Sequence, residues 1–572
     1  MSIPQGTGTE SGAGDQLENA DGRLTSARQP SSWVAPPALT GSVSPIRISA
    51  GAMDRVDRSC DLYLAVKARP ALWSHVPPRL EKQPLPIGVV MEVLDKIEFK
   101  HQSVEVALAE VFERKSLHEG VHVFVASAVQ KYLDATGSSE QLLPVHDQWV
   151  VQHRDAGVRE LWTWGRRYRS RDGGTREVRL LRQGRGGTRQ RSDGERAVAA
   201  YTTAVGSPAP QLRFGQWQQK FAVREAENVS QVKVVEVDLV EGTQHVWFTG
   251  SVDDATTTYD HAGRSAAGRL AYGHHREPGK CFDCRLLTSC DEVVRAPGLL
   301  GIRSQERLRQ VSISDLRYYA KCPAQYFLSS AAHLPRFNEY SMAARLGQAV
   351  HEYLENRHRE ENGPCLAADM PTTPGWSDAR WDLDSRADET GRRMLSHHPE
   401  VCPLRREISD LTLEKTFMLH DTVAQVLVAA KCDLVYQDDG SWVWRETKTT
   451  SREQASDDVI AEYPQVALAV GILGRGLLGG FVEGSRVELE ILRPTHSDLI
   501  PIDPADTETF AQAEAVIRDL ASPWRSDSSF APTPSQDCRT CPVSKWCPSA
   551  EVPDPPSLSE ETTPSAYRKP ST

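Results

Sequence analysis

Two cysteine triplets of identical spacing constrain the fold of this chain more than any other feature. The pattern C-x2-C-x5-C occurs at Cys281, Cys284 and Cys290, and it occurs again at Cys538, Cys541 and Cys547. One further cysteine precedes each triplet by a similar long distance, Cys60 in the first case and Cys322 in the second. Both lone cysteines follow a serine and a short helical pattern, and an aromatic residue comes shortly after each. We therefore predict an internal duplication, with one half at residues 46–300 and the other at 301–550.

Strand and helix patterns alternate inside each half, which predicts the α/β class. The predicted architecture is a tandem pair of modules, each with a mixed central sheet flanked by helices and closed by four cysteines. The outer segments, residues 1–45 and 551–572, are rich in small residues, Pro, Ser and Thr without periodicity. Both are predicted to be disordered, because such segments cannot bury enough apolar surface to fold.

Composition and charge narrow the class of protein further. The chain has 572 residues and a net charge of −11, which argues against a uniformly basic nucleic-acid binder but leaves room for a local basic surface. No stretch approaches the length of a membrane span, and the N-terminus has no signal-peptide pattern. We therefore expect a cytoplasmic protein without a membrane anchor. In that compartment the clustered cysteines are expected to bind metal rather than to form disulfides.

The stretch WVWRETKTT ends an apolar, alternating strand with a carboxylate and an ammonium. An Asp-Asp-Gly turn precedes the strand, so the pattern predicts a β-hairpin. Because side chains alternate across a sheet, Glu446 and Lys448 share a face, and Asp433 on the first arm can reach the same end. A salt bridge on an edge strand is the alternative reading of this pattern.

Three neighbouring elements carry further polar residues. The stretch RLGQAVHEYLENRHRE is predicted to be an amphipathic helix with His351 on the border of its apolar stripe, where a purely structural histidine is the alternative. The stretch LTLEKTFML is predicted to be a strand that carries Glu414. The stretch EYPQVALAVGIL is predicted to be a helix with Gln465 near its start.

These residues, in this order and bracketed by Cys322 and the second cysteine triplet, resemble the PD-(D/E)XK nuclease superfamily. The resemblance is greatest to its iron–sulfur branch, the AddB- and RecB-like modules and the CRISPR-adaptation exonucleases, and it spans Val311 to Ser549. It implies a metal-dependent deoxyribonuclease, exonuclease-like, that acts in DNA repair, recombination or phage defence. Two positions depart from the family pattern: Ala-Lys-Cys precedes Asp433 in place of Gly-x-x, and Ala469 stands where the family has a tyrosine.

The resemblance also implies roles for individual residues. Asp433, Glu446, the carbonyl of Thr447 and His351 would hold Mg²⁺ or Mn²⁺, the imidazole making Mn²⁺ competitive. Lys448 would orient or deprotonate the attacking water or stabilise the transition state. Gln465 would help to position Lys448.

The cysteines are assigned in the same way. The resemblance implies a [4Fe–4S] cluster at Cys322, Cys538, Cys541 and Cys547. Tetrahedral zinc is the alternative. By the duplication, a second Cys₄ centre is predicted at Cys60, Cys281, Cys284 and Cys290. Cys365, Cys402 and Cys432 fit no spacing and are predicted to be ordinary core residues.

The first half is predicted to be a copy without a catalytic metal. The hairpin RYRSRDGGTREVRLLR aligns with the hairpin of the second half, which places Arg167 at the position of Asp433, Leu180 at that of Glu446 and Arg182 at that of Lys448. The surrounding segment is rich in arginine with interleaved aromatic residues, which is typical either of a solvated loop or of a DNA-backbone platform. For the platform, the residues predicted to face DNA are Arg166, Arg167, Arg169 and Arg171.

Two other functions remain open from the sequence. One is a non-catalytic DNA-binding or scaffold protein whose Glu-x-Lys pattern is vestigial, and the other is an RNA-directed nuclease. Because no Walker A pattern occurs in the sequence, DNA unwinding would need a partner helicase or another recombination or defence subunit.

Overall fold

The computed structural model describes residues 33–550 with internal gaps at 57–58, 80–84, 138–141, 155–156, 185–189, 214, 277–278, 305, 338–340, 361–362 and 453–457. All the helices and strands named below lie in one compact unit, which begins at Pro36. The segment 551–572, predicted to be disordered, lies outside the described residues, as does 1–32. Between residues 36 and 45 that prediction is wrong, because Leu39 is buried and β1 (Thr40–Gly41) pairs with β3 (Leu72–Trp73). No helix within the described ranges is long and apolar enough to cross a membrane.

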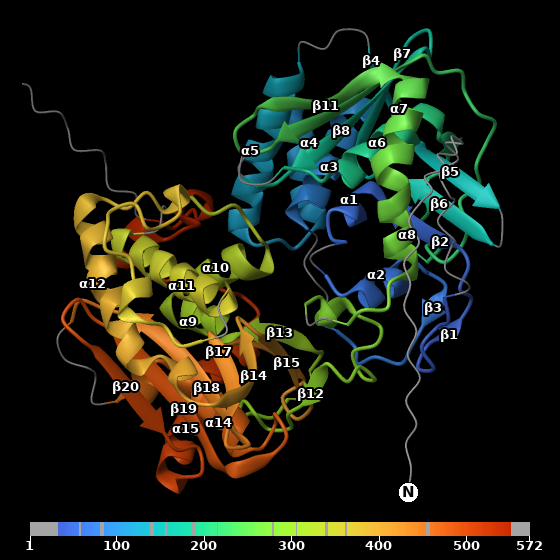
Figure 1. Ribbon diagram of the computed structural model, residues 1–572. Helices are drawn as coiled ribbons and strands as arrows, with labels where there is room; N and C mark the ends of the chain where they lie inside the picture. Colours follow the sequence, from blue (N-terminus) through green and yellow to red (C-terminus); the bar gives the residue numbers. More distant parts are fainter. Residues whose placement is uncertain are drawn as a thin grey trace, which may run out of the picture. The chain divides into compact units, whose positions relative to one another are not determined.

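A five-stranded mixed sheet lies at the centre of the second half (Figure 1). Its strands, in spatial order, are β14 (Ile408–Leu413), β17 (Leu434–Asp438), β18 (Ser441–Thr449), β19 (Phe481–Leu492) and β20 (Ser497–Ile502). β18 runs parallel to β19, and the other neighbouring pairs are antiparallel. The predicted hairpin is present as β17 and β18, with Asp438 paired to Ser441.

The two-residue loop of this hairpin has the geometry that its sequence favours. Asp439 and Gly440 have φ angles of 49° and 79°. Positive φ at both loop positions is the type I′ arrangement, whose twist matches that of the flanking strands and which favours Asp-Gly. The turn fixes the pairing of β17 with β18, and therefore which side chains of β18 face each side of the sheet.

Helices cover both faces of this sheet. Side chains of β18 and β19 point alternately to the two faces, and buried side chains lie on each face. Val487 and Leu489 belong to the main apolar core together with α14 (Pro464–Gly474), which packs on α15 (Thr507–Ser526). Glu490 points to the opposite face, where it contacts α12 (Ser385–Val401). α12 packs on α11 (Met342–Glu360), and these two helices have a small apolar cluster of their own.

A second, smaller sheet extends this half and includes one strand, β12, from the part of the chain predicted to belong to the first half, so the predicted boundary at residue 300 is crossed. Its strands, in spatial order, are β12 (Val293–Arg295), β15 (Thr416–Asp421), β16 (Val426–Lys431) and β13 (Arg309–Ser312). The strand predicted across LTLEKTFML is therefore two strands, β14 and β15, which belong to different sheets and meet at Glu414, where φ is 52°. Likewise β16 ends before Asp433 and β17 begins after it. Both breaks leave a carboxylate at the junction of the two sheets.

The first half contains a five-stranded sheet with the same sequence of pairings. Its strands, in spatial order, are β4 (Leu142–Val145), β7 (Arg166–Ser170), β8 (Thr175–Arg182), β10 (Gln231–Asp238) and β11 (Gln244–Ser251). β8 runs parallel to β10 and the other neighbours are antiparallel, as in the sheet of the second half. In both sheets a helix follows the hairpin and precedes the parallel strand: α6 (Asp193–Val205) here, α14 there.

The remaining elements complete an α/β architecture of mixed sheets flanked by helices, which confirms the predicted class. A four-stranded sheet is formed by β2 (Ile46–Ser49), β6 (Val158–Trp162), β5 (Gln148–Arg154) and β9 (Ser207–Ala209). The other helices of the first half are α1 (Ala50–Met53), α2 (Asp61–Lys67), α3 (Pro86–Lys100), α4 (Val104–Arg114), α5 (Glu119–Thr136), α7 (Val252–Thr258) and α8 (Arg264–Tyr272). Those of the second half are α9 (Ile313–Lys321), α10 (Pro323–Tyr326) and α13 (Val459–Glu462).

Candidate active site

The hairpin β17–β18 brings together the three residues of the predicted Asp…Glu-x-Lys motif. Lys448 Nζ donates to Glu446 Oε2 at 2.9 Å and lies 3.9 Å from Asp433 Oδ2. Asp433 precedes β17, and its carboxylate accepts from the backbone N–H of Thr447 at 2.7 Å. The contact ties the start of one arm to the end of the other. The three side chains therefore form one cluster at the end of the hairpin, and they are not an exposed salt bridge on an edge strand.

Glu446 is nearly fully buried, and its carboxylate has two fixed donors. Trp444 Nε1, on the same face of β18, donates to Glu446 Oε1 at 3.0 Å, and Lys448 Nζ donates to Glu446 Oε2. Burial raises the pKa of the Glu446 carboxyl, the Lys448 ammonium opposes that shift, and Asp433 adds to it. Burial lowers the pKa of Lys448, but attraction to Glu446 and Asp433 outweighs burial, so this pKa is raised overall. A cation that binds here would compete with a proton for Glu446.

Two further side chains approach Asp433 from other elements. His351 on α11 places Nδ1 3.6 Å from Asp433 Oδ1. Glu414 comes from the corner between β14 and β15, where its backbone N–H donates to the Asp433 carbonyl at 2.9 Å. His351, Glu414 and Asp433 each offer one ligand atom, and these atoms all lie within 4.8 Å of one another. The three residues are half-buried and line one small cavity together with Thr447.

The sequence places Glu414 within a single strand and assigns it no role in the site, whereas in the structure Glu414 lies between β14 and β15. The sequence offers one signal, a carboxylate next to a lysine in the middle of an otherwise apolar alternation. Positive φ at a residue other than glycine or asparagine is uncommon and is often found at functional sites. Lys431 pairs with the Glu414 carboxylate from the adjacent strand.

Gln465 lies in the first turn of α14. Its Oε1 is buried and has no hydrogen-bond partner among the described residues. No hydrogen bond joins Lys448 to this oxygen, and the role predicted for Gln465, to help position Lys448, stays a prediction.

Each cysteine quartet lines one cavity. Cys322, Cys538, Cys541 and Cys547 surround the first, and Cys60, Cys281, Cys284 and Cys290 surround the second. Burial raises the pKa of the Cys284 thiol to about 12 and also raises that of Cys541, and the other cysteines of each quartet add to the shift. Such thiols ionise readily only when a metal binds them.

The sulfurs of the two quartets are less closely grouped than the ligand atoms of His351, Glu414 and Asp433. Within the described ranges, neither quartet has three sulfurs that all lie within 4.8 Å of one another. A tetrahedral zinc ion bound at about 2.3 Å from each sulfur holds its sulfurs about 3.8 Å apart.

The predicted arginine platform needs correction. Arg166 and Arg167 are only 4% and 6% exposed. Arg166 pairs with Glu98 at 2.5 Å, and Arg167 donates to backbone carbonyls and to a glutamine side chain. These two guanidinium groups therefore cannot face DNA, because both are buried and are held by neighbouring carboxylates, carbonyls and a glutamine side chain. Arg169 and Arg171 lie at the exposed end of the hairpin, and their predicted contact with DNA stays a prediction.

The prediction that Cys365 and Cys402 are ordinary core residues is incomplete. Both are buried, but they lie with two histidines, His358 and His398, in a compact cluster. The signals that could have revealed it are His358-x6-Cys365 and His398-x3-Cys402, of which the second has a spacing common among zinc ligands. Cys432 is buried, as predicted, and its thiol contacts the carbonyl of Lys415.

A mixed sheet that ends in a cluster of carboxylates, a histidine and a lysine offers ligands for a divalent cation. Residues 310–548 match the sequence model of the PD-(D/E)XK nuclease superfamily. The match supports a nuclease-like fold for the second half, within which the candidate site lies. A solved structure titled "Crystal structure of SSO0001" is 15% identical to the chain, covers 42% of it and 98% of its own length, and has a TM-score of 0.20. No curated protein sequence matches the chain.

Proposed function

We propose that the second half is a metal-dependent deoxyribonuclease that hydrolyses phosphodiester bonds at the end of β18. The observation that carries this proposal is the convergence of His351, Glu414 and Asp433 beside the Lys448–Glu446 pair. The match of residues 310–548 to the nuclease superfamily supports the same class of reaction.

The residues present fit a hard divalent cation. Two carboxylates and an imidazole within 4.8 Å of one another form an oxygen-rich donor set beside a cavity. Such a set leaves coordination positions for water and phosphate, and the imidazole favours Mn²⁺ alongside Mg²⁺. When bound, the cation would lower the pKa of a water and neutralise charge on the scissile phosphate. Glu446 lies next to this set, and its role as a further ligand remains part of the proposal.

The side chains of the hairpin serve the reaction in distinct ways. Lys448 is held as an ammonium by Glu446 and by the carbonyl of Thr447, so it can donate to a phosphate oxygen and stabilise the charge that grows there. The Thr447 N–H fixes the Asp433 carboxylate, and Trp444 fixes that of Glu446. These contacts orient the carboxylates before the substrate binds. A site that is already oriented needs no reorganisation during the reaction, which increases its rate.

The first half is proposed to be a degenerate copy that binds DNA without cutting it. The shared order of antiparallel and parallel pairings in the two central sheets supports the duplication. The residues aligned with the motif are already engaged within the fold: Leu180 is buried and Arg182 pairs with Glu236 at 2.6 Å. Each cysteine quartet lines one cavity, which supports the proposal that each half holds one Cys₄ centre, an iron–sulfur cluster by the resemblance of the second half.

The test is a nuclease assay on protein purified without oxygen, with Mg²⁺ and Mn²⁺ titrated against labelled single-stranded DNA, double-stranded DNA and single-stranded RNA. We expect metal-dependent cleavage of DNA that Glu446→Ala and Lys448→Ala abolish. The control is Glu483→Ala, which removes an exposed glutamate at the far end of β19. Full activity in the Glu446 variant would contradict the proposed site, and cleavage confined to RNA would contradict the proposed substrate.

A further inference from the structure

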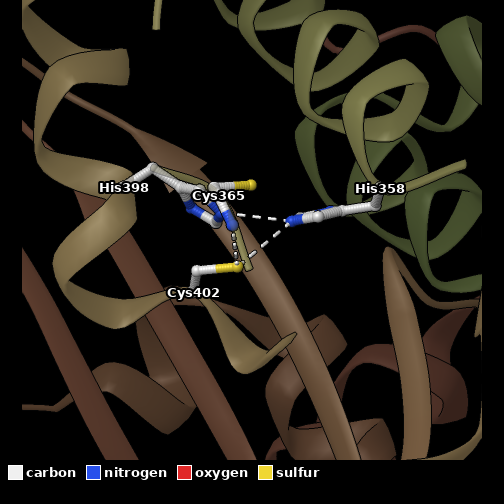
Figure 2. Close-up of side chains that lie close together, drawn as sticks. All are labelled: His358, Cys365, His398 and Cys402. Atoms are coloured by element: carbon white, nitrogen blue, oxygen red, sulfur yellow. Dashed lines mark hydrogen bonds between the residues drawn. The ribbon is translucent and has the colours of Figure 1, made fainter. Parts of the chain in front are cut away.

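The C-terminal ends of α11 and α12 meet at a compact group of two histidines and two cysteines that the proposed reaction does not use (Figure 2). His358 lies in the last turn of α11, and Cys365 lies on the segment that follows it. His398 lies in the last turn of α12, and Cys402 caps that helix. We infer that His358, Cys365, His398 and Cys402 bind a structural Zn²⁺ ion, separate from the nuclease centre and from both cysteine quartets.

The distances between the side-chain atoms fit one tetrahedral ion. His358 Nε2 lies 3.2 Å from His398 Nε2 and 3.8 Å from Cys402 Sγ. A zinc ion at about 2.0–2.1 Å from nitrogen and 2.3 Å from sulfur holds two nitrogens about 3.4 Å apart and a nitrogen and a sulfur about 3.6 Å apart. One ligand atom from each of the four residues lies within 4.8 Å of all the others, a condition that neither cysteine quartet meets.

The hydrogen bonding selects the ring nitrogen that zinc needs. His398 Nδ1 lies 2.6 Å from Glu490 Oε1, so Nε2 is left to face the centre of the group. A carboxylate behind a histidine is the usual support of a zinc ligand, because it fixes the tautomer and the orientation of the ring. Without an ion, the two Nε2 atoms lie 3.2 Å apart, and one of them would have to carry a proton and donate it to the other.

Burial indicates a structural ion and not a catalytic one. His358, Cys365, His398 and Cys402 are only 6%, 2%, 1% and 3% exposed. Four protein ligands complete the tetrahedron, whereas a catalytic zinc keeps one position open for water or substrate. The negative ends of the two helix dipoles also point towards this place, which favours a cation.

The ion would hold the layer of α11 and α12 on the sheet. These helices pack around a small apolar cluster of their own, which includes Leu346, Val350 and Leu395. Small cores gain much of their stability from metal or disulfide cross-links. Glu490 connects the centre to the catalytic strand, because its Oε2 accepts from Thr447 Oγ1 at 3.4 Å. His358 also lines the cavity of the candidate active site.

Zinc content provides the first test. The full chain is purified without oxygen, dialysed against excess Mg²⁺, and its zinc is measured by mass spectrometry. We expect Cys365→Ser/Cys402→Ser to lose one zinc per chain relative to the wild type, whatever metal the quartets hold. The matched control is Cys432→Ser, because Cys432 is an equally buried cysteine outside the group. Retention of that zinc by the double variant would overturn the inference.

X-ray absorption at the zinc edge keeps the test decisive if the double variant fails to fold. The quartets offer only sulfur, and the nuclease site offers none, so in protein that contains one zinc per chain a shell with both is specific to this group. We expect two nitrogens at about 2.0–2.1 Å and two sulfurs at about 2.3 Å in the wild-type protein. A shell of sulfur alone, a zinc-free wild-type protein, or a Cys365–Cys402 disulfide found by mass spectrometry would each overturn the inference. None of these results depends on nuclease activity.

Discussion

Glu414 is the residue whose role the structure changes most. Its carboxylate joins His351 and Asp433 at the corner between two sheets, where it completes a three-ligand set. We expect Glu414→Ala to raise the Mn²⁺ concentration needed for half-maximal cleavage by about tenfold or more, since even residues that only support a ligand contribute 10–100-fold to metal affinity. The measurement is a metal titration of cleavage at saturating DNA.

The matched control for this variant is Glu407→Ala. Glu407 is exposed and lies just before β14, outside the ligand set. Its removal changes the net charge of the same segment by the same amount and should leave the metal dependence unchanged. Equal metal dependence of the Glu414 variant and the wild type would exclude Glu414 from the metal site.

Residue by residue, the sequence predicts those parts of the site that depend on local geometry. Alternation along one strand places Glu446 and Lys448 on one face, and the hairpin turn brings Asp433 to the same end. Glu414 could not be placed in this way, because it reaches Asp433 across the junction of two sheets. The burial of Arg166 could not be predicted either, because its partner Glu98 comes from α3, far away in the sequence.

At the scale of single elements, the hairpin turn controls the geometry of the site. Gly440 has a φ of 79°, and a Cβ added there would meet open space, so the backbone angle alone opposes a larger residue. We expect Gly440→Ala to lower the free energy of unfolding by about 1–2 kcal/mol, the cost of the left-handed conformation. The measurement is chemical denaturation followed by tryptophan fluorescence.

A glycine in an ordinary conformation provides the comparison. Gly268 lies inside α8, where an added Cβ also meets open space. Gly268→Ala should raise the free energy of unfolding by about 0.5–1 kcal/mol, because alanine loses less backbone entropy in a helix. Opposite signs for the two variants are the expected result. A neutral Gly440 variant would show that the turn does not hold the hairpin.

Element boundaries in this chain were less predictable than element types. The alternation from Leu411 to Leu419 predicts one strand, but the chain forms β14 and β15 with a break at Glu414. Period-two alternation continues across such a break, since both strands keep an apolar face, so the pattern carries no signal of the change of sheet. The cysteine spacing, by contrast, picks out two groups of four residues that each line one cavity, because such a spacing does not depend on the strands between its members.

Each quartet joins cysteines that are far apart in the sequence. The clusters that we propose for them are therefore tested on the whole molecule. Protein purified without oxygen should be brown, with a broad absorbance near roughly 400 nm, as iron–thiolate clusters require. Cys538→Ala and Cys60→Ala should each remove about half of the iron, because each alters a different quartet. The measurement is iron content with the absorption spectrum. The control is Cys432→Ser, which should keep both, and a colourless, iron-free wild type would contradict the prediction.

The last prediction concerns the whole molecule and tests whether the first half binds DNA while the second half cuts it. Arg169 and Arg171 are the exposed members of the predicted platform, and they lie in the half without the catalytic motif. Arg169→Ala/Arg171→Ala should weaken DNA binding, and the slope of log affinity against log salt should become shallower by up to about 1.8, since each lost phosphate contact removes about 0.9 of a counterion. The measurement is fluorescence anisotropy with labelled DNA at several salt concentrations. Cleavage of short DNA at saturating concentration should survive, because His351, Glu414 and Asp433 all belong to the other half.

Arg264→Ala, which removes another exposed arginine of the first half, is the control for net charge. If both variants bind DNA with the affinity and salt slope of the wild type, the first half does not contact DNA through this hairpin. If the double variant binds normally but no longer cuts, the first half acts on the catalytic half by some route other than DNA binding.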